Sequence, residues 1–329
     1  MTFVKRILVT GGAGLIGIEV CRQLAEQGHE VRLFDLGEQI LRVKHAIGPD
    51  IKMFFGSILD LSSLRTAMSD CEIVIHLAAL LGVKRSENER LHCIDINIIG
   101  TKNVLDIAVQ QRIKKIVFAS SSEVYGEPLE IPLTEQSLTQ GKTVYAVTKL
   151  AGEELCRAYA QIFPINYTIL RYFNCYGPYQ VAQFVIMKFI RNVMNDKPPI
   201  IFGDGEQIRS YTYVSDTAKA TIMAALSPQT NGEHINIGNG DFPISLRNLA
   251  QMVIRIGGKE GLLLPEYRMD FNDSDRNKER EIYKRYCQAE KAKRLLGWRA
   301  EIPLEEGIKR VFESGVIFDR WENLYDEGP

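Results

Sequence analysis

The stretch ILVTGGAGLIG, residues 7–17, decides the fold of this chain. The apolar run before the glycines predicts a buried strand, and apolar residues at helical spacing after them predict a helix. Gly11 allows the tight turn between the two, Gly14 lets the backbone approach a pyrophosphate, and Gly17 lets the helix pack closely on the strand. The N–H groups and the dipole at the start of that helix favour a bound phosphate. The pattern therefore predicts the opening unit of a dinucleotide-binding fold.

A second predicted strand, VRLFD at residues 31–35, ends in Asp35. A carboxylate at this place in such a fold holds a ribose diol. It would repel the 2′-phosphate of NADP, and no arginine follows it immediately, so the cofactor predicted is NAD. The alternative for Asp35 is a helix cap or a loop acid.

Strand and helix patterns alternate along the chain. The predicted strands cover residues 4–9, 30–34, 51–55, 72–77, 114–120, 166–171 and 234–238, and the predicted helices lie near 14–27, 61–69, 95–111 and 143–162. This alternation predicts an α/β fold with a doubly wound (Rossmann) parallel sheet, whose strands end along one ligand-binding edge. We expect an NAD-binding domain over 1–174 with a return strand near 234–238. A smaller, interleaved substrate lobe is expected over most of 175–329.

Composition narrows the class of protein. The chain has 329 residues, 45% of them hydrophobic and 25% charged, with a net charge of −1, which is typical of an ordinary soluble globular protein and shows no basic excess for nucleic acid. No apolar stretch approaches the ~20 residues of a membrane span, so we expect no membrane association and, by default, a cytoplasmic location. Six cysteines and five histidines show no metal-ligand spacing, so reduced thiols and no metal are expected. The role of Cys175, in a segment expected to line the site, stays open.

The motif YAVTK at residues 145–149 places Tyr145 and Lys149 on one face of a predicted helix. A neighbouring ammonium favours phenolate, so the pair predicts a Tyr145 pKa below the usual ~10 and a role in proton transfer near neutral pH. The alternative is a solvated pair on a surface helix.

Several motifs, in this order along the chain, carry a family resemblance: TGGAGLIG, HLAAL, NIIGTKNVL, FASSSEVYGEP, YAVTKLAGEE, LRYFNCYGP, FGDGEQIRSYTYVSD and KAKRLLGW. Together they resemble an extended short-chain dehydrogenase/reductase of the nucleotide-sugar epimerase and dehydratase group. The resemblance implies a tightly held NAD, a nucleotide-diphosphate sugar in the cleft between the lobes, and oxidation of a sugar hydroxyl, usually at C4. It implies that Tyr145 takes the hydroxyl proton, Lys149 binds the nicotinamide ribose, and Ser121 orients the same oxygen. The alternative for Ser121 is a hydroxyl that closes the strand end.

The resemblance also implies the remaining binding residues. For NAD they are Gly11, Gly14, Leu15, Ile16, Gly17, Asp35, Ser57, Ile58, Leu77, Ala78, Ala79, Tyr145, Lys149 and Tyr172. For the sugar nucleotide they are Arg85, Ser122, Asn174, Arg209 and Arg285. Two departures weaken individual assignments: Ser57 stands where the family usually has an aspartate contacting adenine, and Tyr179 follows YGP where arginine or another polar residue is frequent.

The pair Ser122 and Glu123 leaves the reaction open. In 4,6-dehydratases of this group the two positions are Asp and Glu, in decarboxylases Ser and Glu, and in plain 4-epimerases the Glu is commonly absent. We therefore expect an epimerase acting at C4 through a transient 4-keto intermediate, or a lyase that uses Glu123 as an acid or base. Glu123 in a lobe-bridging salt bridge is a third reading. An NAD sensor without activity is disfavoured by the intact Ser121, Tyr145 and Lys149, and the sequence identifies neither the base nor the sugar.

The family usually pairs through the helix that bears YAVTK and the helix before it. Residues 101–109 (with Val104, Leu105, Ile107 and Ala108) and 147–159 (with Val147, Leu150, Leu155 and Ala158) hold enough apolar positions to cover more than one face. A homodimer is therefore expected.

Overall fold

The computed structural model describes residues 4–269 and 282–317. Its centre is a seven-stranded, all-parallel sheet in the order β11-β6-β5-β4-β1-β2-β3. The strands are β1 (Arg6–Thr10), β2 (Glu30–Asp35), β3 (Lys52–Phe55), β4 (Ile73–His76), β5 (Lys115–Ser121), β6 (Asn166–Tyr172) and β11 (Glu233–Ile237). The predicted doubly wound Rossmann sheet is confirmed, with each of its strands within two residues of the predicted bounds.

Helices cover both faces of this sheet. One face is covered by α3 (Leu61–Met68), α6 (Gly100–Gln110) and α7 (Val144–Ile162), and the other by α1 (Leu15–Glu26), α9 (Val214–Leu226) and α11 (Glu290–Leu296). Successive residues of β1 point to opposite faces. Leu8 packs in the core under α3, α6 and α7, whereas Ile7 and Val9 pack in the core under α1, α9 and α11. Burial on both faces is why the strands read as apolar runs without alternation.

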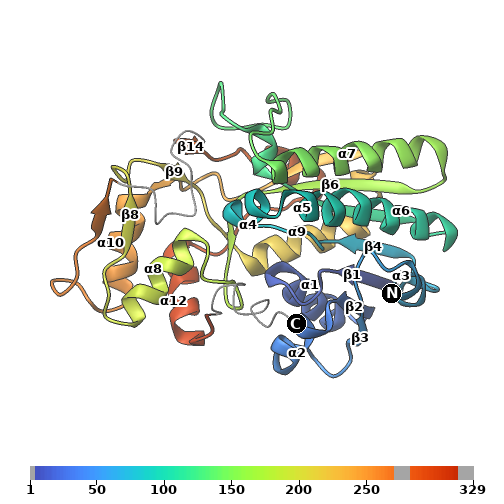
Figure 1. Ribbon diagram of the computed structural model, residues 1–329, viewed down its shortest axis with the longest axis horizontal. Coiled ribbons are helices and arrows are strands. Elements are labelled where there is room, and N and C mark those ends of the chain that lie inside the picture. The colour runs from blue at the N-terminus through green and yellow to red at the C-terminus, as the bar shows by residue number, and fades with distance from the viewer. Residues whose placement is uncertain (1–3, 270–281, 318–329) are drawn as a thin grey trace.

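A second body lies to one side of the sheet (Figure 1). Its core packs α8 (Val185–Met194), α10 (Leu246–Ile256) and α12 (Leu304–Ser314) together. Three small sheets belong to this part of the chain or join it to the main sheet: β8 (Ile200–Phe202) with β13 (Glu266–Arg268); β9 (Ile208–Arg209) between β12 (Ile244–Ser245) and β14 (Lys284–Arg285); and β7 (Cys175–Tyr176) with β10 (Thr212–Tyr213). Below, the seven-stranded sheet with its covering helices is called the sheet, and the second body is called the lobe.

The remaining helical segments are short. They are α2 (Gly37–Val43), η1 (Lys44–Ala46), α4 (Val83–Asn88), α5 (Arg90–Ile94), the π-helical turn η2 (Asp95–Ile99), η3 (Ser122–Tyr125) and η4 (Pro228–Thr230). The helix predicted near 95–111 thus starts earlier, at Arg90, and contains a π turn. Within 4–269 and 282–317, no helix combines the length and apolarity needed to cross a membrane.

The chain returns to the sheet from the lobe more than once. After β10 it enters α9, which packs against α1, and then β11, which pairs with β6 along its length. The buried Lys115 of β5 secures this return, since its Nζ donates to Ala224 O at 2.7 Å, Ser227 O at 2.6 Å and Thr230 Oγ1 at 2.9 Å. The ammonium thus satisfies carbonyls at the C-terminus of α9, and its burial lowers the pKa of Lys115 to about 8.

Candidate active site

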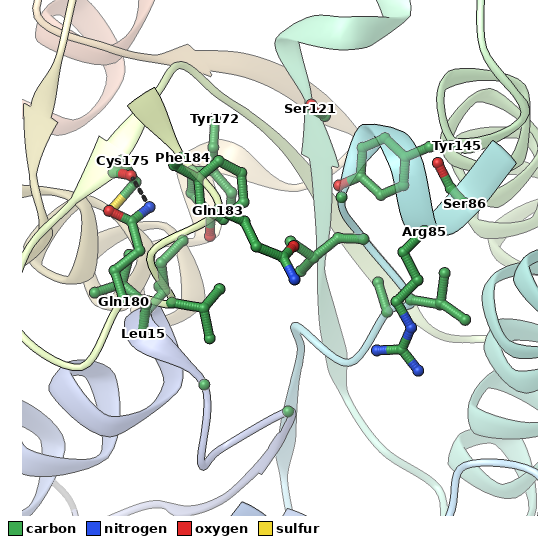
Figure 2. Close-up of a pocket in the computed structure, with 18 of the residues that line it drawn as sticks. Leu15, Arg85, Ser86, Ser121, Tyr145, Tyr172, Cys175, Gln180, Gln183 and Phe184 are labelled. Carbon is green, nitrogen blue, oxygen red and sulfur yellow. Dashed lines mark hydrogen bonds between the residues drawn. The ribbon is translucent and has the colours of Figure 1, made fainter. Parts of the chain in front are cut away.

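A cavity of about 720 Å³ opens at the carboxyl ends of the central strands and extends into the lobe. Every residue that the sequence assigned to the site lines it, from the glycine turn to Arg285. The strand ends and the first turn of α7 supply one wall, and the segment after Gly177 with α8, β8 and β9 supplies the other (Figure 2). The parallel sheet brings these groups together, because its strands all end on the same edge.

The glycine turn is sterically tight. Gly11 has a φ of +69°, and a Cβ there would lie 2.6 Å from Ala78 N. A Cβ on Gly17 would lie 2.2 Å from Gly11 O, so this glycine is what lets α1 sit against the turn. Gly14 precedes the first residue of α1, whose N-terminus has neither a side-chain cap nor an acidic residue in its first turn. The N–H groups that begin a helix have no partner inside it, and here they suit a phosphate.

Asp35 ends β2 beside this turn. Its Oδ2 accepts from Ala13 N at 3.0 Å, and its Oδ1 accepts from Leu36 N at 2.8 Å. Burial raises the pKa of Asp35 to about 6, although both N–H bonds favour the charged form. The adjoining helix α2 has no side-chain cap, so Asp35 does not serve as its N-cap. The carboxylate is instead oriented toward the cavity edge where the glycine turn lies.

Ser121, Tyr145 and Lys149 converge from β5 and α7. Figure 2 shows Ser121 and Tyr145 at the same end of the cavity. Lys149 Nζ lies 5.7 Å from the centroid of the Tyr145 ring and donates to Ala119 O at 2.8 Å. Burial lowers the pKa of Lys149 to about 8. The pair therefore lies at the cavity, with Lys149 buried and Tyr145 half-buried, and the surface-helix alternative is wrong.

The expected lowering of the Tyr145 pKa is not what the structure shows. Burial, followed by the carboxylate of Glu123, raises the pKa of Tyr145 above its ordinary value, and the Ser121 hydrogen bond opposes this only in part. Lys149 does not offset the burial, because its ammonium is bonded to the carbonyl of Ala119 rather than to the phenol. The prediction from helical spacing was wrong because it counted the nearby charge and left out desolvation.

Glu123 and Arg285 form an ion pair across the cavity wall. Arg285 Nη1 lies 2.7 Å from Glu123 Oε1, and their side chains are 9% and 22% exposed respectively. Glu123 belongs to η3 at the end of β5 and Arg285 to β14, so the pair joins the sheet to the lobe as one of the sequence readings proposed. The buried Nε of Arg285 has no hydrogen-bond partner among the described residues.

The other expected substrate residues are held by the protein itself. Arg209 donates to the carbonyls of Ile208 at 2.8 Å, Tyr283 at 3.2 Å and Ile282 at 2.5 Å. Asn174, at a φ of +36°, donates to Ser210 O at 2.8 Å. These bonds hold the start of the lobe, β9 and the chain before β14 around the cavity.

Three further residues show how the cavity rim is tied down. Arg85 donates from Nε to Glu89 Oε1 at 3.1 Å, and Figure 2 shows its guanidinium directed away from Tyr145. The buried Ser122 also lines the cavity beside Glu123. The Ser57 hydroxyl accepts from Leu59 N at 3.2 Å, within its own turn.

Cys175 and Tyr172 both line the cavity wall at the end of β6. Burial raises the pKa of the Cys175 thiol to about 12, which disfavours the nucleophilic thiolate. The Tyr172 hydroxyl bonds to Thr221 Oγ1 at 2.8 Å. Burial thus favours the neutral, unreactive thiol form of Cys175.

Sequence reasoning missed the segment that closes the lobe side, where Gln180, Gln183 and Phe184 line the cavity. Figure 2 shows Gln183 extending across the middle of the cavity, and Gln180 donates to Cys175 O at 2.9 Å. Tyr179, with a φ of +70°, lies with its ring centroid 5.8 Å from that of His45. The available signal was the pair of glutamines in YQVAQF, polar residues just before an apolar helix.

Comparison with known proteins agrees with this geometry. Residues 7–238 match the model of the NAD dependent epimerase/dehydratase family. A putative UDP-glucose 4-epimerase of Methanocaldococcus jannaschii is 37% identical over 310 residues, covering 93% of this chain and 96% of the relative. A UDP-N-acetyl-alpha-D-glucosaminuronate decarboxylase of Bacillus cytotoxicus is 34% identical over 319 residues, covering 94% and 97%.

A solved structure is similar over the same extent. The UDP-glucuronic acid 4-epimerase of Bacillus cereus, in complex with UDP-glucuronic acid and NAD, has a TM-score of 0.84 and 30% identity, covering 94% of this chain and 98% of that one. The chain belongs to the NAD dependent epimerase/dehydratase family. The predicted family and the predicted cofactor, NAD, are confirmed.

Proposed function

We propose that the protein is an NAD-dependent nucleotide-sugar epimerase that acts at C4 through a transient 4-keto sugar. The observation that carries this proposal is the meeting of Ser121, Tyr145 and Lys149 with the glycine turn on one cavity. A hydroxyl pair beside a cofactor cradle suits removal and return of the proton of a sugar hydroxyl. The two named epimerases among the similar proteins support the same reaction class.

The residues present fit NAD. Any side chain on Gly11 would collide with Ala78, the uncapped start of α1 suits the pyrophosphate, and Asp35 offers carboxylate oxygens to a ribose diol. NAD bound there would supply the acceptor and later the donor for the hydride of the sugar carbon. Lys149 would hold the nicotinamide ribose, and Ser57, Ile58, Leu77, Ala78, Ala79 and Tyr172 would complete the walls of the NAD site.

Tyr145 would move the proton. As the phenolate it would accept the proton of the sugar hydroxyl as the ketone forms and so become the phenol, and Ser121 would hold the sugar oxygen by a hydrogen bond. Lys149 supplies a positive charge close to the phenol ring, which stabilises the phenolate before the proton arrives and after it leaves again. For inversion, the ketone must turn within the cavity before the proton returns from the same hydroxyl.

The sugar nucleotide would occupy the lobe side of the cavity. Arginine donates bidentately to a diphosphate, and Arg85, Arg209 and Arg285 all line that side with Ser122 and Asn174. Both named epimerases among the similar proteins act on UDP sugars, so UDP sugars are the first substrates to test.

A second candidate is a lyase, a nucleotide-sugar decarboxylase or an atypical dehydratase. The observation that favours it is the 2.7 Å pair of Glu123 and Arg285 at the cavity, which sets an acid or base beside a cation able to receive a sugar carboxylate. The similar decarboxylase from Bacillus cytotoxicus supports it.

A panel of nucleotide sugars with product mass as the readout separates the candidates. Unchanged mass with a new stereoisomer supports the epimerase, and loss of carbon dioxide or water supports the lyase. Stoichiometric NAD binding without turnover of any sugar nucleotide would refute both the epimerase and the lyase, and would favour an NAD sensor without activity. Glu123→Gln is the matched variant: an epimerase keeps hydride transfer within about tenfold, ~1.4 kcal/mol, whereas a lyase accumulates NADH because the later step stalls. A variant that loses the first hydride transfer contradicts both roles for Glu123.

We also propose that the chain forms a homodimer through α5, η2 and α7. Val147 is 52% exposed, Leu91 78% and Ile162 71%, which leaves an apolar face on these helices. Val104, Leu105, Ile107 and Ala108, which the sequence reading offered to this interface, are buried within the subunit instead. A monomer by light scattering at micromolar concentration would remove this proposal.

A further inference from the structure

A buried polar chain joins the elements that carry the proposed catalytic groups. Glu153 lies on α7 one turn after Lys149, and its two carboxylate oxygens accept from Arg171 of β6, with Nε to Oε1 at 2.8 Å and Nη2 to Oε2 at 2.7 Å. The same Oε1 accepts from Ser120 Oγ at 2.6 Å, next to Ser121 on β5. The Glu153 and Arg171 side chains are 1% and 5% exposed.

The chain continues to the segment that bears Glu123. Arg171 Nη1 donates to the Tyr125 hydroxyl at 3.0 Å, and the guanidinium carbon lies 4.9 Å from the centroid of that ring. The Tyr125 hydroxyl donates to Asn236 Oδ1 of β11 at 2.6 Å. Tyr125 ends η3, the turn that also contains Ser122 and Glu123.

Resting on the function proposed above, we infer that Glu153 and Arg171 are positioning residues for its reaction, fixing α7, β5 and η3 relative to one another so that Tyr145, Lys149, Ser121 and Glu123 keep their geometry. The bidentate fork constrains both distance and angle, which a single apolar contact would not do. Small displacements at a reacting centre are costly in rate, so a network of this kind acts on turnover more than on binding. The network touches neither cofactor nor substrate positions directly, since Glu153 and Arg171 do not line the cavity.

The carboxylate of Glu153 also acts on Lys149 electrostatically. Burial lowers the pKa of Lys149 to about 8, and Cys93 of α5 and then Cys156 and Glu153 of α7 act in the raising direction. This ammonium also faces His76 of β4, which is held neutral by burial, and the rings of Phe118 of β5 and Tyr145. Removal of the Glu153 charge therefore moves the pKa of Lys149 further down.

The test is kinetic and spectroscopic, with Lys115→Met as the matched control. Lys115 is equally buried on β5 but at its opposite end, so its loss lowers stability without touching the network. For Glu153→Gln we expect kcat to fall at least tenfold with KM within about threefold, and the alkaline limb of the kcat profile to move to lower pH. Glu153→Asp should recover part of kcat, and Tyr125→Phe, which keeps the ring, should lower it by a smaller factor.

The pKa of Lys149, followed by NMR of ¹³C-labelled lysine side chains, supplies a readout that needs no substrate. A downward shift in Glu153→Gln supports the inference even if no sugar nucleotide is turned over, so failure of the proposed function is recognised separately. An unchanged kcat and Lys149 titration in folded Glu153→Gln and Tyr125→Phe would overturn it. An equal fall of kcat in Lys115→Met at matched temperature would overturn it too, because lost stability alone would then explain the effect.

Discussion

Asp35 gives a prediction in which protonation has opposite effects on stability and on NAD binding. Its pKa is raised by burial from 3.8 to about 6, so the native state binds this proton more tightly than the unfolded chain. The contribution to stability is therefore present in full below about pH 4 and is lost as the pH rises through 6. The difference between the folded and unfolded pKa of Asp35 corresponds to at most ~3 kcal/mol of stability, and partial exposure of the carboxylate reduces the expected value to ~1–2 kcal/mol.

Asp35→Asn removes the titration while keeping the shape. Urea unfolding of NAD-free protein at pH 4.5 and 7.5 should show the wild type losing ~1–2 kcal/mol relative to the variant as the pH rises. Asp60→Asn is the control, because serine and backbone donors at the start of α3 lower the pKa of Asp60 to about 2. Its titration therefore lies below about pH 4, so the stability difference between the wild type and this variant should be the same at pH 4.5 and at pH 7.5.

NAD binding should run the other way. A ribose diol needs the ionised carboxylate as acceptor, so wild-type affinity for NAD should weaken below about pH 6 while Asp35→Asn stays weak and nearly flat with pH. The same variant should discriminate less against NADP, since it repels the 2′-phosphate less. Parallel stability curves for wild type and variant, or a wild type that already prefers NADP, would refute the reasoning about this carboxylate.

Two further predictions concern single atoms of the site. Tyr145→Phe removes the proton acceptor and keeps the ring, so NAD and sugar nucleotide should still bind while turnover falls by at least ~10²-fold; substantial residual turnover in steady-state assays would assign the proton to another group. Gly17→Ala would place a Cβ 2.2 Å from Gly11 O, so we expect a lower Tm and loss of bound NAD. Gly48→Ala is the control, because its Cβ would meet only a side chain at 3.8 Å, and it should leave Tm and NAD binding unchanged. Equal Tm values for these two variants would contradict the tight packing of α1 on the turn.

The main sheet was predictable because parallel strands buried on both faces leave continuous apolar runs. The run at 166–171, for example, corresponds to β6 at Asn166–Tyr172. Helix α9 was not predicted, because its own residues are buried on nearly all sides and its sequence shows no amphipathic stripe. Elements of the lobe were also missed, since their strands are two or three residues long and give little periodic signal.

The site was predictable as a set of residues but not as a set of interactions. Motifs at strand ends identify the lining, because topology alone brings those ends together. The pairing of Glu123 with Arg285 depends on how the lobe folds back, which no local pattern encodes. The raised pKa of Tyr145 depends on burial by segments far away in the chain, so helical spacing predicted the wrong sign.

The repeated return of the chain to the sheet limits how this architecture can be altered. The segment that follows β6 builds part of the lobe, then contributes α9 and β11 to the sheet, and then returns to the lobe. No single cut of the chain separates one body from the other, so the lobe cannot be transplanted as a contiguous cassette. New substrate preferences in this scaffold must arise by substitutions and loop changes around the cavity, in a chain that keeps its cofactor-binding sheet.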